Sequence, residues 1–236
     1  MDTSLLQRLR GFHATPVVKM DPSRHLVARM RGVGFPAILA SPEFGFETPF
    51  DLRFTKMLVR VASQLLGGES CGVFAFAEQF ELSVCLSPKQ LAHTDWENIG
   101  DLQTYLVGIA AARMSLQLGD EAVFDCELFA FPDPQLVHSY FVWRRSEALA
   151  TALENYSYHV LTKDNRNRAD VQKLIAGLGP KEREVILRQN GIDWDAIPRW
   201  QRDGTGLSLD GDGKLRLNSE LPEGPDYMSY LKDILS

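Results

Sequence analysis

The order in which strand-like and helical patterns follow one another constrains the fold of this chain more than any other feature. Four short segments have the apolar pattern of strands: residues 27–30, 71–76, 80–86 and 124–131. Three longer segments have apolar residues at helical spacing: residues 50–66, 101–118 and 134–161. The resulting order βαββαβα predicts an α+β fold, with a sheet covered by helices on one face.

The pattern changes after residue 162. Two short helical segments, at residues 170–177 and 181–189, precede a stretch rich in Gly and Asp at 203–214. We therefore predict a first domain at residues 1–162 and a C-terminal helical and irregular region at residues 163–236.

The charge of the chain argues against a general affinity for nucleic acid. The formal net charge is −6, so RNA binding has to depend on a local basic patch. The densest patch is K-D-N-R-N-R at 163–168, followed by one more lysine. Its alternative interpretation is a solvated loop after a helix. The candidate RNA-binding residues are Lys163, Arg166, Arg168 and Lys173.

The apolar runs of the sequence are much shorter than the roughly 20 residues that span a bilayer. Residues 1–10 also lack the apolar core of a signal peptide, so we expect a cytoplasmic protein that does not enter membranes. The three cysteines form no C-x-x-C pair, which argues against a disulfide framework and against a zinc site. Composition and periodicity alone thus support a soluble α+β protein.

Four segments, in the same order along the chain, resemble the motifs of one known family. The segment T-P-F-D-L-R-F at 48–54 resembles K-P-[YF]-D-E-R-F, and F-D-C-E-L-F at 124–129 resembles F-D-A-R-x-F. The segment Y-F-V-W-R-R at 140–145 resembles Y-F-x-W-R-Q, and G-I-D-W-D-A-I-P-R-W-Q-R-D-G at 191–204 resembles G-I-N-[WF]-N-D-L-P-x-[WY]-Q-K-R-G. The chain is therefore similar to the tRNA-His guanylyltransferase family of 3′–5′ nucleotidyltransferases. This resemblance implies a polymerase-palm-like antiparallel sheet flanked by helices, tetrameric assembly, nucleoside triphosphates with magnesium, and tRNA as substrate.

The two metal-binding aspartates that the resemblance implies are absent from the matching positions. The family motif R-x-D-G-R reads R-M-R-G-V at 29–33, and Y-x-Q-S-D-E reads F-A-E-Q-F-E at 76–81. Arg31 and Phe80 therefore occupy the metal positions, and neither a guanidinium nor a phenyl ring has an oxygen for magnesium. Glu81 is the one matching carboxylate. Glu78 lies on the same face of the strand as position 80 and is a possible replacement ligand.

We therefore expect a degenerate family member, a pseudoenzyme of the nucleotidyltransferase class with no metal and no cofactor. It would act as a tRNA-binding, nucleotide-binding or assembly module, as a homo-oligomer or as a mixed oligomer with an active paralogue. The resemblance implies nucleotide-binding roles for Arg29, Gly32, Asp51 and Arg53. The alternative is an active enzyme with a rebuilt metal site that uses Mg²⁺ with GTP or ATP to add guanosine to the tRNA 5′ end. A third reading is a palm-derived protein that signals through a nucleotide or a protein partner.

Two opposite charge reversals accompany the lost aspartates. Arg31 replaces a family aspartate, and Glu127 replaces the arginine of F-D-A-R. We predict an ion pair between Arg31 and Glu127, with Glu81 as a competing partner, because a partly buried guanidinium needs compensation. Independent drift at the two positions is the alternative.

Overall fold

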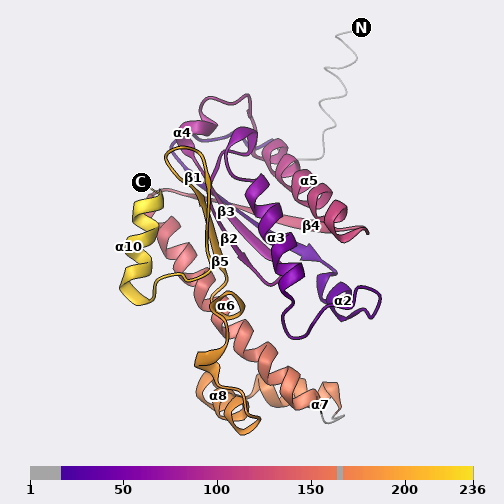
Figure 1. Cartoon of the computed structure of the whole chain (residues 1–236). Helices are drawn as coiled ribbons and strands as arrows, with labels where there is room; N and C mark the ends of the chain where they lie inside the picture. Colours follow the sequence, from indigo (N-terminus) through magenta and orange to yellow (C-terminus); the bar gives the residue numbers. More distant parts are fainter. Residues whose placement is uncertain (1–16, 164–166, 236) are drawn as a thin grey trace.

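The computed structural model describes residues 17–163 and 167–235. These residues form one six-stranded antiparallel sheet with the strand order β4-β1-β3-β2-β5-β6 (Figure 1). The strands are β1 (His25–Val33), β2 (Gly72–Glu78), β3 (Glu81–Leu86), β4 (Val123–Phe131), β5 (Thr205–Leu209) and β6 (Leu215–Asn218). The mixed helix and antiparallel-sheet fold predicted from the sequence is confirmed.

Helices connect and cover these strands. The longer ones are α3 (Leu52–Gln64), α5 (Ile99–Leu118), α6 (Pro134–Thr162), α7 (Arg168–Ala176), α8 (Pro180–Gln189) and α10 (Gly224–Leu235). The shorter ones are α2 (Phe35–Ala40), α4 (Pro88–Leu91) and α9 (Arg199–Arg202), with 3₁₀ turns at Gly68–Ser70 and Trp194–Ala196. Among the described residues, no helix combines the length and apolar character needed to cross a lipid bilayer.

Local sequence explains where the main helices begin and end. The carboxylate of Asp51 accepts hydrogen bonds from the backbone N–H groups of Arg53 and Phe54, which caps α3. Asp133 caps α6 in the same way, and Pro134 occupies its first turn. Helix α5 ends at Gly119, whose positive φ of 76° suits a residue without a side chain.

Helices cover both faces of the sheet, so the expectation of one covered face is wrong. Alternate residues of β1 explain how: Ala28 and Met30 pack in a core with α3 and α5, whereas Val27 packs in a core with α6 and α10. Figure 1 shows α3 and α5 on one side of the strands and α6 and α10 on the other. Helix α10 lies in the predicted helical and irregular region, beyond the Gly- and Asp-rich stretch, where no separate helix was predicted.

The chain after α6 packs in two different places. Helices α7 and α8 pack against the C-terminal half of α6, which extends beyond the sheet (Figure 1). The chain then returns to the sheet, where β5 pairs with β2 and β6 pairs with β5. The predicted helical and irregular region therefore also contributes two strands, which the sequence analysis missed. The proposed boundary after residue 162 stays a prediction.

Candidate functional site

Four charged side chains form a cluster between the sheet and α6, which we call the ion cluster: Arg29, Glu78, Glu81 and Arg144. Arg144 is 1% exposed, and its guanidinium lies 2.7 Å from Glu78 Oε1 and 2.9 Å from Glu81 Oε2. Arg29 lies 2.8 Å from Glu81 Oε2 on the other side. The register brings the two carboxylates together, because Glu78 and Glu81 are cross-strand partners at the β2–β3 turn.

Burial dominates the protonation of Glu78. Its pKa rises from 4.5 to about 7, because the loss of water outweighs the attraction of Arg144. The Oε2 atom of Glu78 is buried, and no described residue donates a hydrogen bond to it. Near neutral pH the Glu78 carboxyl of the folded chain is therefore partly protonated, whereas the same carboxyl of the unfolded chain is ionised.

A falling stability between about pH 4.5 and pH 7 is the first testable consequence. The folded chain binds more protons than the unfolded chain in this window, so the free energy of unfolding decreases as the pH rises, by up to about 1.4 kcal/mol per pH unit. Chemical denaturation at several pH values measures this slope. Glu78→Gln carries no titrating proton and should flatten it. An identical slope in both proteins would contradict the assignment.

The residues at the two family metal positions do not fit magnesium. Arg31 is half-exposed and forms an ion pair with Asp125 at 2.6 Å. Phe80 packs against the core of α3 and α5, and only its backbone carbonyl accepts a hydrogen bond, from Gly32 N–H at 2.9 Å. The nearby carboxylates Glu78 and Glu81 are already held by guanidinium groups. Among the described residues, no group of three or more His, Cys, Asp or Glu side chains could hold a metal ion.

The predicted ion pair between Arg31 and Glu127 is wrong. The antiparallel register of β1 and β4 places Arg31 opposite Asp125 and Arg29 opposite Glu127. Glu127 therefore lies near Arg29, with 4.0 Å between the charged groups. Asp125, and not Glu127, is the carboxylate that pairs with Arg31. The competing partner Glu81 pairs with Arg29 and Arg144 instead.

A cavity of about 380 Å³ lies between α2, the loop before α3, the β2–β3 turn and the C-terminal half of α6; we call it the α2–α6 cavity. Leu39, Phe50, Phe54 and Phe80 are among its apolar lining residues, and Thr48, Asn155, His159 and Arg168 are among its polar ones. The Oγ1 atom of Thr48 lies 3.3 Å from Nδ1 of His159. Such a concave site with a few polar groups suits a small ligand.

The contribution of α6 to this cavity was not predicted from the sequence. Asn155, Tyr158, His159 and Thr162 all line it, and they recur at helical spacing on one face of α6. That spacing was the available signal. His159 was passed over because the five histidines of the chain show no metal-ligand spacing.

The predicted nucleotide-binding residues lie in two places. Asp51 lines the α2–α6 cavity, where hydrogen bonds from Arg53 and from backbone N–H groups lower the pKa of its buried carboxyl to about 2. Arg53 pairs with Asp51 and stacks on Phe46. Arg29 belongs to the ion cluster instead. Gly32 lies under the ring of Phe35, where an added Cβ would be 2.1 Å from the ring.

The predicted RNA-binding residues lie around the end of α6. Lys163 and Lys173 are exposed, and Arg168 lines the α2–α6 cavity. Arg166 lies outside the described residues.

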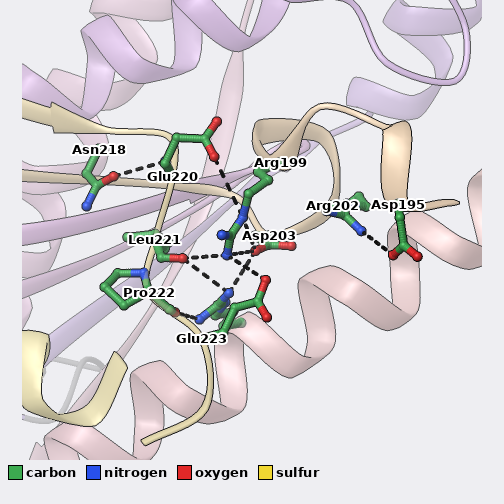
Figure 2. A network of polar contacts seen from close by, with 10 residues as sticks. Asp195, Arg199, Arg202, Asp203, Asn218, Glu220, Leu221, Pro222 and Glu223 are labelled. Carbon is green, nitrogen blue, oxygen red and sulfur yellow. Dashed lines mark hydrogen bonds and ion pairs between the residues drawn. The ribbon is translucent and has the colours of Figure 1, made fainter. Parts of the chain in front are cut away.

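A second buried ion network, the Asp203 network, joins α6 to the C-terminal segment. Asp203 is 3% exposed, and one of its oxygens lies 2.7 Å from the guanidinium of Arg145 and 2.7 Å from that of Arg199. Figure 2 shows Arg199 between Asp203 and the backbone carbonyl of Leu221. Arg145 also donates to the carbonyl of Pro222 and lies over the ring of Tyr227.

Fold and site together define a palm-type domain: an antiparallel sheet with α6 across one face and a ligand-sized cavity beside the β2–β3 turn. No family model matches the chain. Its sequence is 22% identical to the tRNA(His) guanylyltransferase of Debaryomyces hansenii over 197 residues, which cover 79% of this chain and 74% of that protein. In sequence and in fold the chain is thus similar to tRNA(His) guanylyltransferases and Thg1-like proteins.

Solved structures share the fold of this chain. A bacterial tRNA(His) guanylyltransferase (Thg1)-like protein in complex with ATP has a TM-score of 0.81 and 17% identity, and the match covers 98% of this chain and 99% of the other. The tRNA(His) guanylyltransferase of Saccharomyces cerevisiae has a TM-score of 0.74 and 20% identity, with 89% and 94% coverage. The palm fold implied by the sequence motifs is thus confirmed.

Proposed function

We propose that this protein binds a nucleotide in the α2–α6 cavity and does not carry out two-metal nucleotidyl transfer. The observation that carries the proposal is the position of Arg144, whose guanidinium contacts both Glu78 and Glu81. Two-metal transfer needs carboxylates that are free to hold cations. Here the guanidinium of Arg144 lies between the two carboxylates and compensates their negative charge, which disfavours binding of magnesium.

The α2–α6 cavity has the composition that a nucleotide needs. Its aromatic wall includes the partly exposed rings of Phe50 and Phe80, which offer surfaces on which a base can stack. Thr48, Asn155 and His159 offer polar groups for a base or a ribose, and Arg168 offers a positive charge for phosphate. The similar bacterial protein in complex with ATP supports the same ligand class.

The RNA and assembly roles extend this proposal. Lys163 follows the end of α6, Arg168 begins α7 and Lys173 lies in the last turn of α7, and all three offer positive charge to tRNA phosphates. We propose tRNA as the partner, bound by a cytoplasmic homo-oligomer or by a mixed oligomer with an active paralogue. The alternative is an active nucleotidyltransferase in which Arg144 moves away and the unpartnered Oε2 of Glu78 joins a rebuilt metal site.

Calorimetric titration with GTP and with ATP tests the nucleotide site. We expect one site per chain, with an affinity that changes by less than about threefold between EDTA and excess magnesium, because no protein carboxylate would hold the metal. Ala40 is an exposed residue at the cavity wall on α2, so Ala40→Trp should weaken binding about tenfold or more. Ala37→Trp is the matched control, since Ala37 is also exposed on α2 but does not line the cavity.

A guanylylation assay separates the two functional readings. Labelled guanosine should not be added to monophosphorylated or triphosphorylated tRNA, with or without magnesium. Incorporation that depends on magnesium and disappears in Glu81→Ala would establish the active-enzyme alternative. Absence of any nucleotide binding by the unaltered protein would refute the nucleotide-binding role itself.

A further inference from the structure

A second cavity lies at the opposite end of α6, and the proposed function does not use it. It holds about 500 Å³ and lies between the first turn of α6, the end of β3 and the end of α10; we call it the α6–α10 cavity. Val137 lines this cavity and Tyr158 lines the α2–α6 cavity. The two residues are about 30 Å apart along the helix at 1.5 Å per residue, so the cavities are separate sites.

The inner wall of the α6–α10 cavity is apolar. Val73, Leu86, Val137 and Ile234 all line it. Cys85 is the fifth wall residue, and burial raises the pKa of its thiol to about 12. The thiol therefore stays protonated at neutral pH and acts as an apolar surface rather than as a nucleophile.

The polar lining of this cavity is basic, in a chain whose formal net charge is −6. Four of the lining residues are His25, Lys89, His138 and Lys232, and none of the lining residues is acidic. Lys89 and Lys232 are exposed, and neither forms an ion pair with a described residue. Two lysines without partners at the mouth of an apolar cavity favour a negatively charged ligand.

His138 adds an independent observation. Its side chain is 5% exposed, and its Nδ1 atom is buried without a hydrogen-bond partner in the part of the chain that the structure describes. Burial, with Lys232 and His25 nearby, lowers its pKa, so the ring is neutral at pH 7. Buried polar groups in folded proteins usually have partners, so an unsatisfied imidazole in a cavity wall is typical of a site built for a ligand.

We propose that the α6–α10 cavity binds a small anionic amphiphile, with its carboxylate or phosphate head at Lys89 and Lys232 and its apolar chain against the inner wall. Charge and shape both support this class of ligand. A neutral lipid would leave the lysines without a counter-ion, and a purely polar anion would leave the apolar wall in contact with water.

Titration of the full chain with octanoate, octyl phosphate and 1-octanol tests this proposal by NMR or calorimetry. We expect at least one of the two anions to bind with one site per chain and about tenfold tighter than 1-octanol. Tighter binding of octanoate would assign a carboxylate head, and tighter binding of octyl phosphate would assign a phosphate head. The double variant Lys89→Glu/Lys232→Glu should weaken anion binding about tenfold or more.

The matched control is Lys56→Glu/Lys181→Glu, which makes the same change in net charge at exposed lysines on α3 and α8, away from this cavity. This control should leave anion binding unchanged. No saturable binding of either anion up to about 1 mM would overturn the proposal. Equal weakening by the two double variants would also overturn it. Both double variants should bind GTP like the unaltered protein, because Lys89 and Lys232 do not line the α2–α6 cavity. Titration with GTP therefore tests the nucleotide proposal separately.

Discussion

Replacement of Arg144 by methionine should lower the free energy of unfolding by about 3–5 kcal/mol at pH 8. Methionine keeps much of the length and apolar contact of arginine but removes the cation that contacts Glu78 and Glu81. Glu81 keeps Arg29 as its partner, whereas Glu78 remains buried and loses the one ion pair that it forms among the described residues. An uncompensated charge in such a place is among the most destabilising changes that one substitution can make. Chemical denaturation followed by circular dichroism measures the loss.

The pH dependence of that loss distinguishes charge from packing. Without Arg144, Glu78 can be buried at low cost only when it is protonated, so the loss should shrink at pH 5. Arg31→Met is the matched control, because the same substitution breaks an ion pair whose arginine is 56% exposed. It should cost far less, because an exposed ion pair contributes little to stability. An equal loss of stability from Arg144→Met at pH 5 and at pH 8 would assign the effect to packing. Arg144 would then not stabilise the fold by compensating the charge of Glu78.

The same cluster limits how much of the candidate site the sequence could predict. The motif comparison located positions 31 and 80 and the surviving Glu81, because these depend only on matching residues. It did not predict that Arg144 reaches across from α6 to the β2–β3 turn, since the contact spans 66 residues of chain. The charge at position 31 likewise predicted an acidic partner for Arg31, but the partner is Asp125 and not Glu127. A shift of two positions in the register of β1 and β4 decides which carboxylate faces Arg31.

The elements of the fold divide in a similar way. The helices at α3, α5 and α6 and the β2–β3 pair have strong apolar periodicity, and all were predicted close to their observed ends. Strands β5 and β6 were missed because their neighbours Asp203, Gly211 and Gly213 read as turn residues and because β6 is short and mostly exposed. Such strands are stabilised by tertiary pairing rather than by their own pattern. Helix α10 was missed because Pro222 precedes it and Pro225 lies in its first turn, so this part of the chain has the residue pattern of a turn.

The C-terminal segment also contains a coupled exchange of residues relative to the family motifs. Arg145 stands where the motif Y-F-x-W-R-Q has glutamine, and Asp203 stands where the G-I-N-[WF] motif has arginine. In this chain the two residues form a buried ion pair at 2.7 Å that links α6 to the segment before β5. The paired exchange therefore places opposite charges on the two sides of this contact in the present chain.

Asp203→Ala should therefore lower the free energy of unfolding by about 3–5 kcal/mol. The substitution leaves Arg145 buried and Arg199 mostly buried, with their guanidinium groups close together and their shared carboxylate removed. Because Arg199 also holds the carbonyl of Leu221, the linker before α10 should loosen as well, which hydrogen exchange in α10 would report. Figure 2 shows that Arg199 contacts both Asp203 and the carbonyl of Leu221.

Asp195→Ala is the control for this prediction, because Asp195 lies in the same segment and pairs with Arg202 but is 93% exposed. It should change stability by about 0–1 kcal/mol and leave exchange in α10 unaltered. A double-mutant cycle of Arg145→Gln with Asp203→Ala then isolates the pair. The Asp203→Ala loss should be smaller when residue 145 is glutamine, since no second buried guanidinium is then left behind. Additive losses would mean that Asp203 acts through Arg199 and the backbone, and that the paired exchange with Arg145 carries no energetic coupling.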